Sequence, residues 1–270
     1  MLNPNSNITI ASYPYNYLVI EDLFDEGTSF ALRMLLDHHM TKGKTIGKVG
    51  EVGEHSYEAL SYTPSFDDIV HSPISQIASS NLKNLIARLF RIGLDENIMI
   101  GTHRHLPPSK PGWTHTDFAI VSFPPIPINY DGQRIYDERG GCRYSDDSRD
   151  RQPSSIKTAR AIACLYYTAN PEWKPGMGGE TGIYLQDGKT LVTTIPPKNN
   201  SLFAFEISPL SYHAYMGSEN MQRSCYIWWY HASPSMLVRR YASLVAVRNR
   251  EGRDPWDRWT EPAVPKYEVV

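Results

Sequence analysis

The stretch from Asn97 to Leu106 reads NIMIGTHRHL, and it marks the point where the chain changes from helical to strand-like patterning. Its residues alternate between two faces, as they do in a β-strand with a period of two. Further short strands with turn residues between them follow, as far as CYIWWYH at residues 225–231. Seven or more short strands at such spacing indicate a β-sandwich or a β-barrel.

Upstream of this stretch the patterning is mostly helical. Residues 13–20 (YPYNYLVI) predict a strand, but Asp22–His39 carries apolar residues at the spacing of a buried helix face. Residues 42–60, rich in glycine and charge, predict a hairpin or a loop. Ser72–Ile92 predicts a second helix with a proline in its first turn. We therefore expect a helical layer, about residues 20–93, that supports the sheet.

One domain accounts for the whole chain (residues 1–270) in this prediction. Its core runs from about residue 97 to residue 231, and residues 235–270 supply a C-terminal helix and a tail. Residues 129–157 are dense in Asp, Arg, Gly and Ser, and they are longer than a connection normally needs to be. Such a segment is either a solvated insertion or a lid over a substrate, and both interpretations stay open.

Composition disfavours several classes of function. The formal net charge of −2 gives no support for nucleic-acid binding. The three cysteines are widely spaced and form no CxxC pair, so neither a disulfide framework nor a zinc site is indicated. The first residues do not resemble a signal peptide, and no apolar run approaches the ~20 residues of a membrane span. We expect a cytoplasmic protein without membrane or nucleic-acid partners, and its oligomeric state stays open.

Residues 113–117, WTHTD, carry the first candidate site. In an extended strand His115 and Asp117 point to the same face, so an imidazole nitrogen and a carboxylate oxygen can converge on one cation. A His-x-Asp pair alone is weak evidence, because chance can supply one. His213 is the candidate third ligand, and Arg223 follows with a guanidinium that suits a carboxylate. Two imidazoles and one carboxylate that leave open coordination positions are typical of non-heme Fe(II) oxygenases.

With these residues the sequence resembles the Fe(II)/2-oxoglutarate-dependent dioxygenase superfamily, and within it the prolyl-hydroxylase branch. The resemblance covers about residues 97–231. The segments that carry it are His115-Thr116-Asp117, Arg160 to Tyr167, the loop from Trp173 to Gly178-Gly179-Glu180, His213 with Arg223, and Ile227 to Tyr230. It implies a mainly β fold with flanking helices, whose core is a double-stranded β-helix (a cupin-like jelly roll). It also implies Fe(II), 2-oxoglutarate and O2 as cofactor and cosubstrates.

The resemblance further implies the reaction. It makes His115, Asp117 and His213 the catalytic iron ligands. The reaction of the family converts 2-oxoglutarate to succinate and CO2 and oxidises an unactivated C–H bond of the substrate. Halogenating members have Gly or Ala in place of the carboxylate, so Asp117 favours hydroxylation or another oxidation.

A cosubstrate pocket is implied in the same way. Arg223 would bind the distal carboxylate of 2-oxoglutarate, and Tyr167 would hydrogen-bond that carboxylate from the facing strand. Two further residues, Thr181 and Trp229, fall where the family lines this pocket. Each of the three could instead be a core packing residue. The family often has a serine where this chain has Cys225, so a supporting hydroxyl contact is in doubt while the arginine–carboxylate pair is intact.

The substrate is less well indicated. Candidate contacts are His105, Arg160 and Trp113, although His105 could be a satisfied core histidine and Arg160 a member of a structural ion pair. The polar insertion favours a small polar metabolite, as in amino-acid or natural-product tailoring, over the protein substrate of a peptidyl-prolyl hydroxylase. Two different classes of protein compete with the oxygenase: a non-catalytic cupin-like metal-binding module, and a zinc hydrolase that uses Glu180 as its base.

Overall fold

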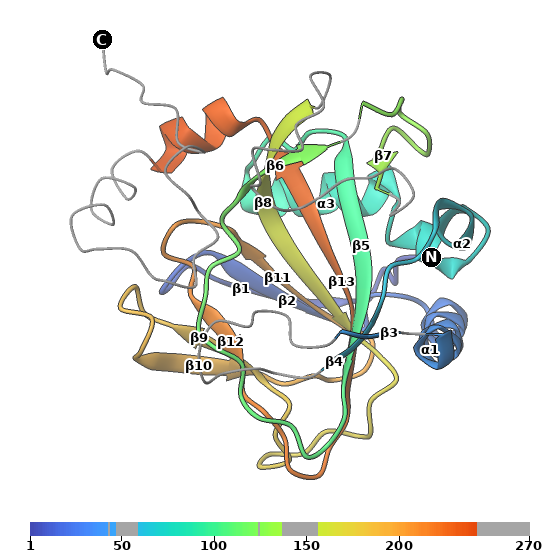
Figure 1. Cartoon of the computed structure of the whole chain (residues 1–270), viewed down its shortest axis with the longest axis vertical. Coiled ribbons are helices and arrows are strands. Elements are labelled where there is room, and N and C mark those ends of the chain that lie inside the picture. The colour runs from blue at the N-terminus through green and yellow to red at the C-terminus, as the bar shows by residue number, and fades with distance from the viewer. Residues whose placement is uncertain (43, 47–58, 124, 137–155, 242–270) are drawn as a thin grey trace.

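Figure 1 shows the computed structural model of the chain, in which residues 1–42, 44–46, 59–123, 125–136 and 156–241 are described. The prediction of a lid at 129–157 falls largely on residues 137–155, and the predicted tail falls on residues 242–270; both lie outside the described residues. Residues 234–241 are helical, which agrees with the expected start of a C-terminal helix.

Strands make up most of the regular structure. The helices are α1 (Glu26–Lys42), α2 (Phe66–Val70), the 3-10 helix η1 (Pro73–Gln76) and α3 (Ser80–Phe90). The strands are β1 (Asn7–Ala11), β2 (Tyr17–Glu21), β3 (Lys44–Ile46), β4 (Ala59–Tyr62), β5 (Asn97–His105), β6 (Ile120–Phe123), β7 (Arg134–Ile135), β8 (Ile156–Tyr167), β9 (Thr181–Tyr184), β10 (Leu191–Ile195), β11 (Ser201–Glu206), β12 (His213–Tyr215) and β13 (Arg223–Ala232).

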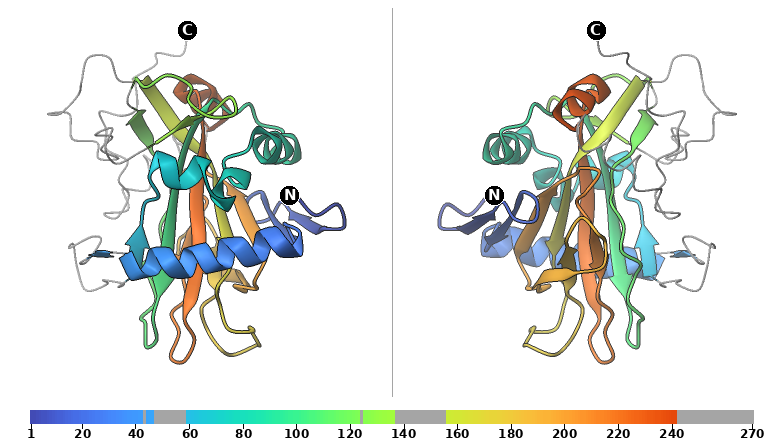
Figure 2. Two further views of the ribbon diagram at one scale, coloured as in Figure 1. Left: turned by 90° about the vertical axis from the view of Figure 1, so that its right-hand side faces the viewer. Right: turned by 90° about the vertical axis from the view of Figure 1, so that its left-hand side faces the viewer.

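The strands form two sheets of unequal size. The larger has ten strands, in the order β1-β2-β11-β8-β13-β5-β4-β3, with β6 paired to β8 and β7 paired to β5. The smaller has the order β10-β9-β12 and lies over the opposite face of the larger sheet from α1 (Figure 2). This confirms the expected mainly β fold with flanking helices around a jelly-roll core.

The two central strands, β8 and β13, are buried on both faces. They pair antiparallel, from Cys225 opposite Tyr167 to Ala232 opposite Ala159. Nine of the ten residues of β13 are buried. Helices cover one face and the smaller sheet the other, so these strands have long apolar runs instead of a polar–apolar alternation.

Helix α1 crosses one face of the larger sheet (Figure 2, left). Leu32 and Leu36 of α1 are fully buried, and the Tyr226 hydroxyl of β13 donates a 3.0 Å hydrogen bond to the Leu32 carbonyl. α3 buries Leu82, Ile86 and Phe90, which follow one another at four-residue spacing on one side of the helix. No helix among the described residues is long and apolar enough to span a membrane.

The predicted helix Ser72–Ile92 is wrong in its continuity. The segment begins as η1 and restarts as α3, because the Ser79 side chain caps α3 by accepting from the Leu82 N–H. A capping serine satisfies a backbone donor that a continuous helix would have used internally. The prediction also missed α2, whose N-terminus is stabilised by a capping box between Ser65 and Asp68.

Boundaries near the N-terminus also differ from those expected. The strand predicted at residues 13–20 begins only at Tyr17, and β1 precedes it as its antiparallel partner. α1 begins at Glu26, after Asp22 has taken a left-handed conformation with φ 54°. The predicted hairpin at 42–60 is present in its two arms, since β3 pairs with β4, while residues 47–58 lie outside the described part.

Candidate metal centre

A short antiparallel bridge brings His115 next to His213. His115 lies in the connection between β5 and β6. The backbone N–H of each histidine donates a 3.0 Å hydrogen bond to the backbone carbonyl of the other. Their ring centroids are 4.5 Å apart. Only His115 of the 113–117 segment has strand-like pairing, so a single bridge, not a full strand, aligns these side chains.

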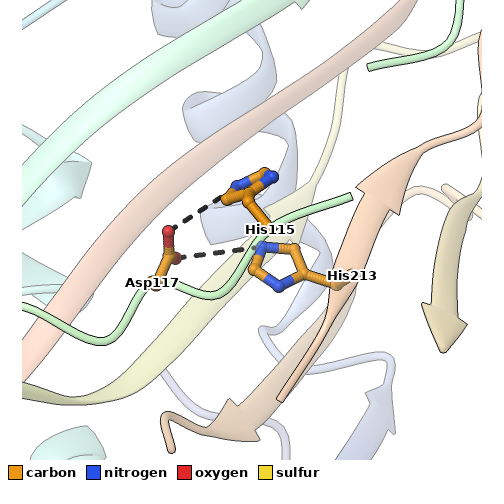
Figure 3. A group of neighbouring side chains, drawn as sticks. All are labelled: His115, Asp117 and His213. Carbon is orange, nitrogen blue, oxygen red and sulfur yellow. Dashed lines mark ion pairs between the residues drawn. The ribbon is translucent and has the colours of Figure 1, made fainter. Parts of the chain in front are cut away.

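Three potential ligand atoms converge beside this bridge (Figure 3). The Nε2 atom of His115 lies 3.8 Å from Oδ1 of Asp117, and the Nε2 atom of His213 lies 4.0 Å from Oδ2. All three ligand atoms lie within 4.8 Å of one another, so one ion can contact all of them. The structure thus brings together the three residues that the sequence singled out.

Backbone carbonyls fix the tautomer of both histidines. The Nδ1 atom of His115 is 2.9 Å from the Trp113 carbonyl oxygen, and that of His213 is 3.2 Å from the Ser211 carbonyl oxygen. A carbonyl oxygen only accepts, so each Nδ1 carries the proton and each Nε2 presents its lone pair towards Asp117. Metal-binding histidines are usually held in this way.

The charge states also suit a cation. Burial raises the pKa of Asp117, but His213, Arg160, His115 and the Trp229 N–H lower it more, to about 2. Burial, with a smaller contribution from His115, lowers the pKa of His213 to about 4. At neutral pH the site therefore offers a carboxylate and a neutral imidazole, which are the forms that bind a metal. Two imidazoles and one carboxylate with open positions fit Fe(II).

Arg223 lies at the other end of the same cavity. It is 4% exposed, and its Nη2 atom is 3.3 Å from the Thr181 hydroxyl, which in turn is 2.8 Å from the Tyr167 hydroxyl. Its Nε atom is buried without a hydrogen-bond partner, and among the described residues no acid forms an ion pair with Arg223. A buried guanidinium without an acid fits the distal carboxylate of 2-oxoglutarate.

The cavity that joins the two ends has a volume of about 220 Å³. Trp113, His105 and Arg160, the candidate substrate contacts, all line it. Glu180 does not line it, and among the described lining residues Asp117 is the one acid, so a zinc hydrolase would lack its general base here.

Several residues that line the cavity were not predicted from the sequence, and Tyr215 and His103 are two of them. Tyr215 stacks on His105 with ring centroids 4.0 Å apart, and the Arg223 guanidinium lies 5.5 Å from the centre of its ring. Tyr215 follows His213 by two residues on β12, so the two-residue strand period could have identified it. His103 also lines the cavity, and burial and Arg223 lower its pKa to about 4.

One side chain of the cavity wall, Trp229, also contacts Asp117. It lines the cavity, but its indole N–H donates a 2.8 Å hydrogen bond to Oδ2 of Asp117. The Arg160 guanidinium stacks on the Trp229 ring at 4.3 Å from the centroid and lies 3.6 Å from Oδ1 of Asp117. Both residues thus contact the candidate metal ligand.

Comparisons with known proteins agree with this geometry. Residues 134–231 match the family model of the 2OG-Fe(II) oxygenase superfamily, a span that contains His213 and Arg223 and begins after Asp117. Among curated protein sequences, none is similar enough to this chain to count as a match.

Several solved structures resemble the fold. A Pseudomonas putida prolyl-4-hydroxylase aligns with a TM-score of 0.51 and 16% identity, over 79% of this chain and 91% of that chain. A Trichoplax adhaerens prolyl hydroxylase in complex with a hypoxia inducible factor peptide fragment aligns with a TM-score of 0.49 and 15% identity, over 79% and 83%. At such identities the first likeness shows the fold alone. Residues 134–231 thus match the 2OG-Fe(II) oxygenase superfamily, and this match with the His–Asp–His cluster supports a 2-oxoglutarate-dependent dioxygenase that uses Fe(II), 2-oxoglutarate and O2.

Proposed function

We propose that this enzyme hydroxylates an unactivated C–H bond of a small polar substrate, with His115, Asp117 and His213 as the iron ligands and Arg223 as the anchor of 2-oxoglutarate. One observation carries the proposal: a largely buried His–Asp–His cluster and a buried arginine that forms no ion pair with a described acid line one cavity. In this proposal the whole chain forms one oxygenase domain.

Fe(II) held by His115, Asp117 and His213 would, with 2-oxoglutarate and O2, supply the oxidising chemistry of this class, in which 2-oxoglutarate is converted to succinate and CO2. The residues of the chain supply binding and orientation. Arg223 and Thr181 hold the distal carboxylate, with the Tyr167 hydroxyl bonded to the Thr181 hydroxyl. Apolar side chains of the cavity wall, among them the buried Leu165 and the partly buried Ile227, exclude water from the reacting centre.

The cavity supports a small substrate in preference to a bulky one. Its volume of about 220 Å³ is below the ~300 Å³ at which most drug-sized ligand sites begin. Arg160 and Trp113 give it a polar and an aromatic wall. A peptidyl-prolyl hydroxylase is the second candidate, and the fold likeness to a prolyl-4-hydroxylase favours it.

The test is an anaerobic titration with Fe(II) and 2-oxoglutarate, followed by measurement of succinate after oxygen is admitted. We expect both ligands to bind and succinate to form slowly without substrate. His213→Ala should abolish metal binding, whereas Arg223→Ala should raise the 2-oxoglutarate requirement and spare the metal; Arg33→Ala, on the exposed face of α1, is the matched control. Wild-type protein that binds no 2-oxoglutarate would refute the proposal.

Candidate substrates can then be ranked by how strongly they stimulate succinate release. Free amino acids and other small polar compounds form one panel, and proline-containing peptides form the other. Stimulation by a small compound that gains one oxygen atom supports the first candidate. Stimulation by peptides alone, with oxygen found on proline, supports the second.

A further inference from the structure

The polar atom of Trp229 faces Asp117 and not the cosubstrate end of the cavity. Its indole N–H donates to Oδ2 of Asp117 at 2.8 Å, and both side chains are largely buried, with Trp229 8% exposed. A buried hydrogen bond to a charged acceptor is strong and well directed. This contact is therefore a fixed feature of the site.

The two oxygens of Asp117 have different surroundings. Oδ2 accepts the indole N–H, whereas Oδ1 accepts no hydrogen bond from any described residue. The nearest cation to Oδ1 is Nη1 of Arg160 at 3.6 Å, which is too far for a hydrogen bond, and Nε2 of His115 lies 3.8 Å away. Oδ1 thus keeps its lone pairs for another partner.

A carboxylate can bind a metal through either oxygen or through both. Three protein ligands leave three octahedral positions open only if the carboxylate binds through one oxygen. We propose that Trp229 is a positioning residue, whose N–H holds Oδ2 of Asp117 and directs Oδ1 to the metal as a single ligand. This inference rests on the proposed function, because it takes Asp117 as an iron ligand.

Arg160 completes the arrangement from the other side of the indole. Its guanidinium stacks on the Trp229 ring and lies near Oδ1 without hydrogen bonding to it. The Trp229 ring, which β13 carries, therefore packs against Arg160 of the neighbouring strand β8. This packing fixes the direction of the indole N–H. A phenylalanine at position 229 keeps a ring for Arg160 to stack on and removes only the donor.

The experiment measures metal affinity without 2-oxoglutarate, by anaerobic calorimetry with Fe(II) and, in parallel, Mn(II). We expect Trp229→Phe to weaken binding by about 10- to 100-fold, which is the usual effect of removing a hydrogen bond to a metal ligand. The matched control is Trp228→Phe. Trp228 is fully buried in the same strand, but it points to the opposite face and should leave the affinity unchanged.

One outcome overturns the inference directly. If Trp229→Phe binds metal as wild type does and only 2-oxoglutarate binds more weakly, Trp229 lines the cosubstrate pocket and does not position Asp117. Failure of the proposed function looks different, because wild type and Trp228→Phe would then also lack metal binding.

A second pair of variants covers a folding failure of Trp229→Phe. Trp229→Gln keeps an N–H that can donate to Asp117, and Trp229→Leu does not. The inference requires tighter metal binding by the glutamine variant. Equal affinity of the two variants would overturn it.

Discussion

The buried charges at the two ends of the cavity have different kinds of partner. At the metal end, the Asp117 carboxylate has the Trp229 N–H at 2.8 Å and the Arg160 guanidinium at 3.6 Å. At the other end, Arg223 is equally buried but contacts a threonine hydroxyl and two tyrosine rings. The chain itself organises the metal end. We propose that a bound anion completes the arginine end.

This difference has an energetic meaning. A buried charge without a partner costs several kcal/mol of desolvation that nothing in the protein repays. Arg223 cannot lose its charge, since a guanidinium keeps its proton inside proteins. We therefore infer that binding, and not stability, accounts for an arginine at this position.

The largest effect is expected from removing the charge at the metal end. Asp117→Ala removes one of three proposed ligands, so metal affinity should fall by more than ~100-fold. Calorimetry with Fe(II) under anaerobic conditions measures it. The exposed Asp67→Ala serves as the control, and retention of wild-type affinity by Asp117→Ala would contradict the assignment.

At the arginine end we expect a substitution to increase the stability of the folded protein. Arg223→Met replaces the unpaired cation by an apolar side chain of similar length, and it should stabilise the protein by about 1–4 kcal/mol. Urea unfolding without metal or 2-oxoglutarate measures this. Asp117→Asn should destabilise under the same conditions, because the ion pair between the Asp117 carboxylate and Arg160 is then lost. Destabilisation by Arg223→Met would show that Arg223 is already balanced.

His231 provides a third kind of buried group, one that can lose its charge. Burial lowers its pKa to about 4, while the Asn97 carbonyl accepts from its Nδ1 at 3.0 Å. Below about pH 6.5 the unfolded chain binds a proton that the folded protein does not, so stability falls towards pH 4. His231→Asn, which can keep the hydrogen bond, should reduce this slope by up to ~1.4 kcal/mol per pH unit. Urea unfolding at several pH values tests it, and an unchanged slope would contradict it.

The smallest effect is expected from the hydroxyl that links Tyr167 to Arg223. Thr181→Val keeps the shape and removes this hydroxyl, which should weaken 2-oxoglutarate binding by about 1 kcal/mol, or roughly five-fold. Anaerobic titration of the metal-loaded protein measures it. Metal affinity should not change, and an equal loss of both affinities would show that Thr181 supports the whole site.

Local patterns in the sequence indicated most of the strands from Asn97 onward but missed β1 and α2, and the candidate site residues also needed the family resemblance. The apolar runs of β8 and β13 follow from burial on both faces, and His115, Asp117, His213 and Arg223 follow from residue type and a family resemblance. The long-range contacts that bring the site residues together were harder to predict. The His115–His213 bridge pairs residues 98 positions apart, and no local pattern encodes such a contact.

The orientation of the Trp229 side chain could not be predicted either. The strand period places Trp229 on the cavity face, but it does not say whether the indole N–H turns towards Arg223 or towards Asp117. The break between η1 and α3 could have been predicted from the sequence, because Ser79 is a good capping residue. It was missed because apolar spacing continues across it.

The most direct test compares two ligands on two proteins. Anaerobic titrations of metal-loaded wild type and Arg223→Met with 2-oxoglutarate, and with a 2-oxo acid of similar length that lacks the distal carboxylate, form a cycle. We predict that Arg223→Met weakens 2-oxoglutarate binding by about 2–5 kcal/mol and leaves the 2-oxo monoacid unchanged. Equal losses for both ligands would contradict the claim that Arg223 holds the distal carboxylate.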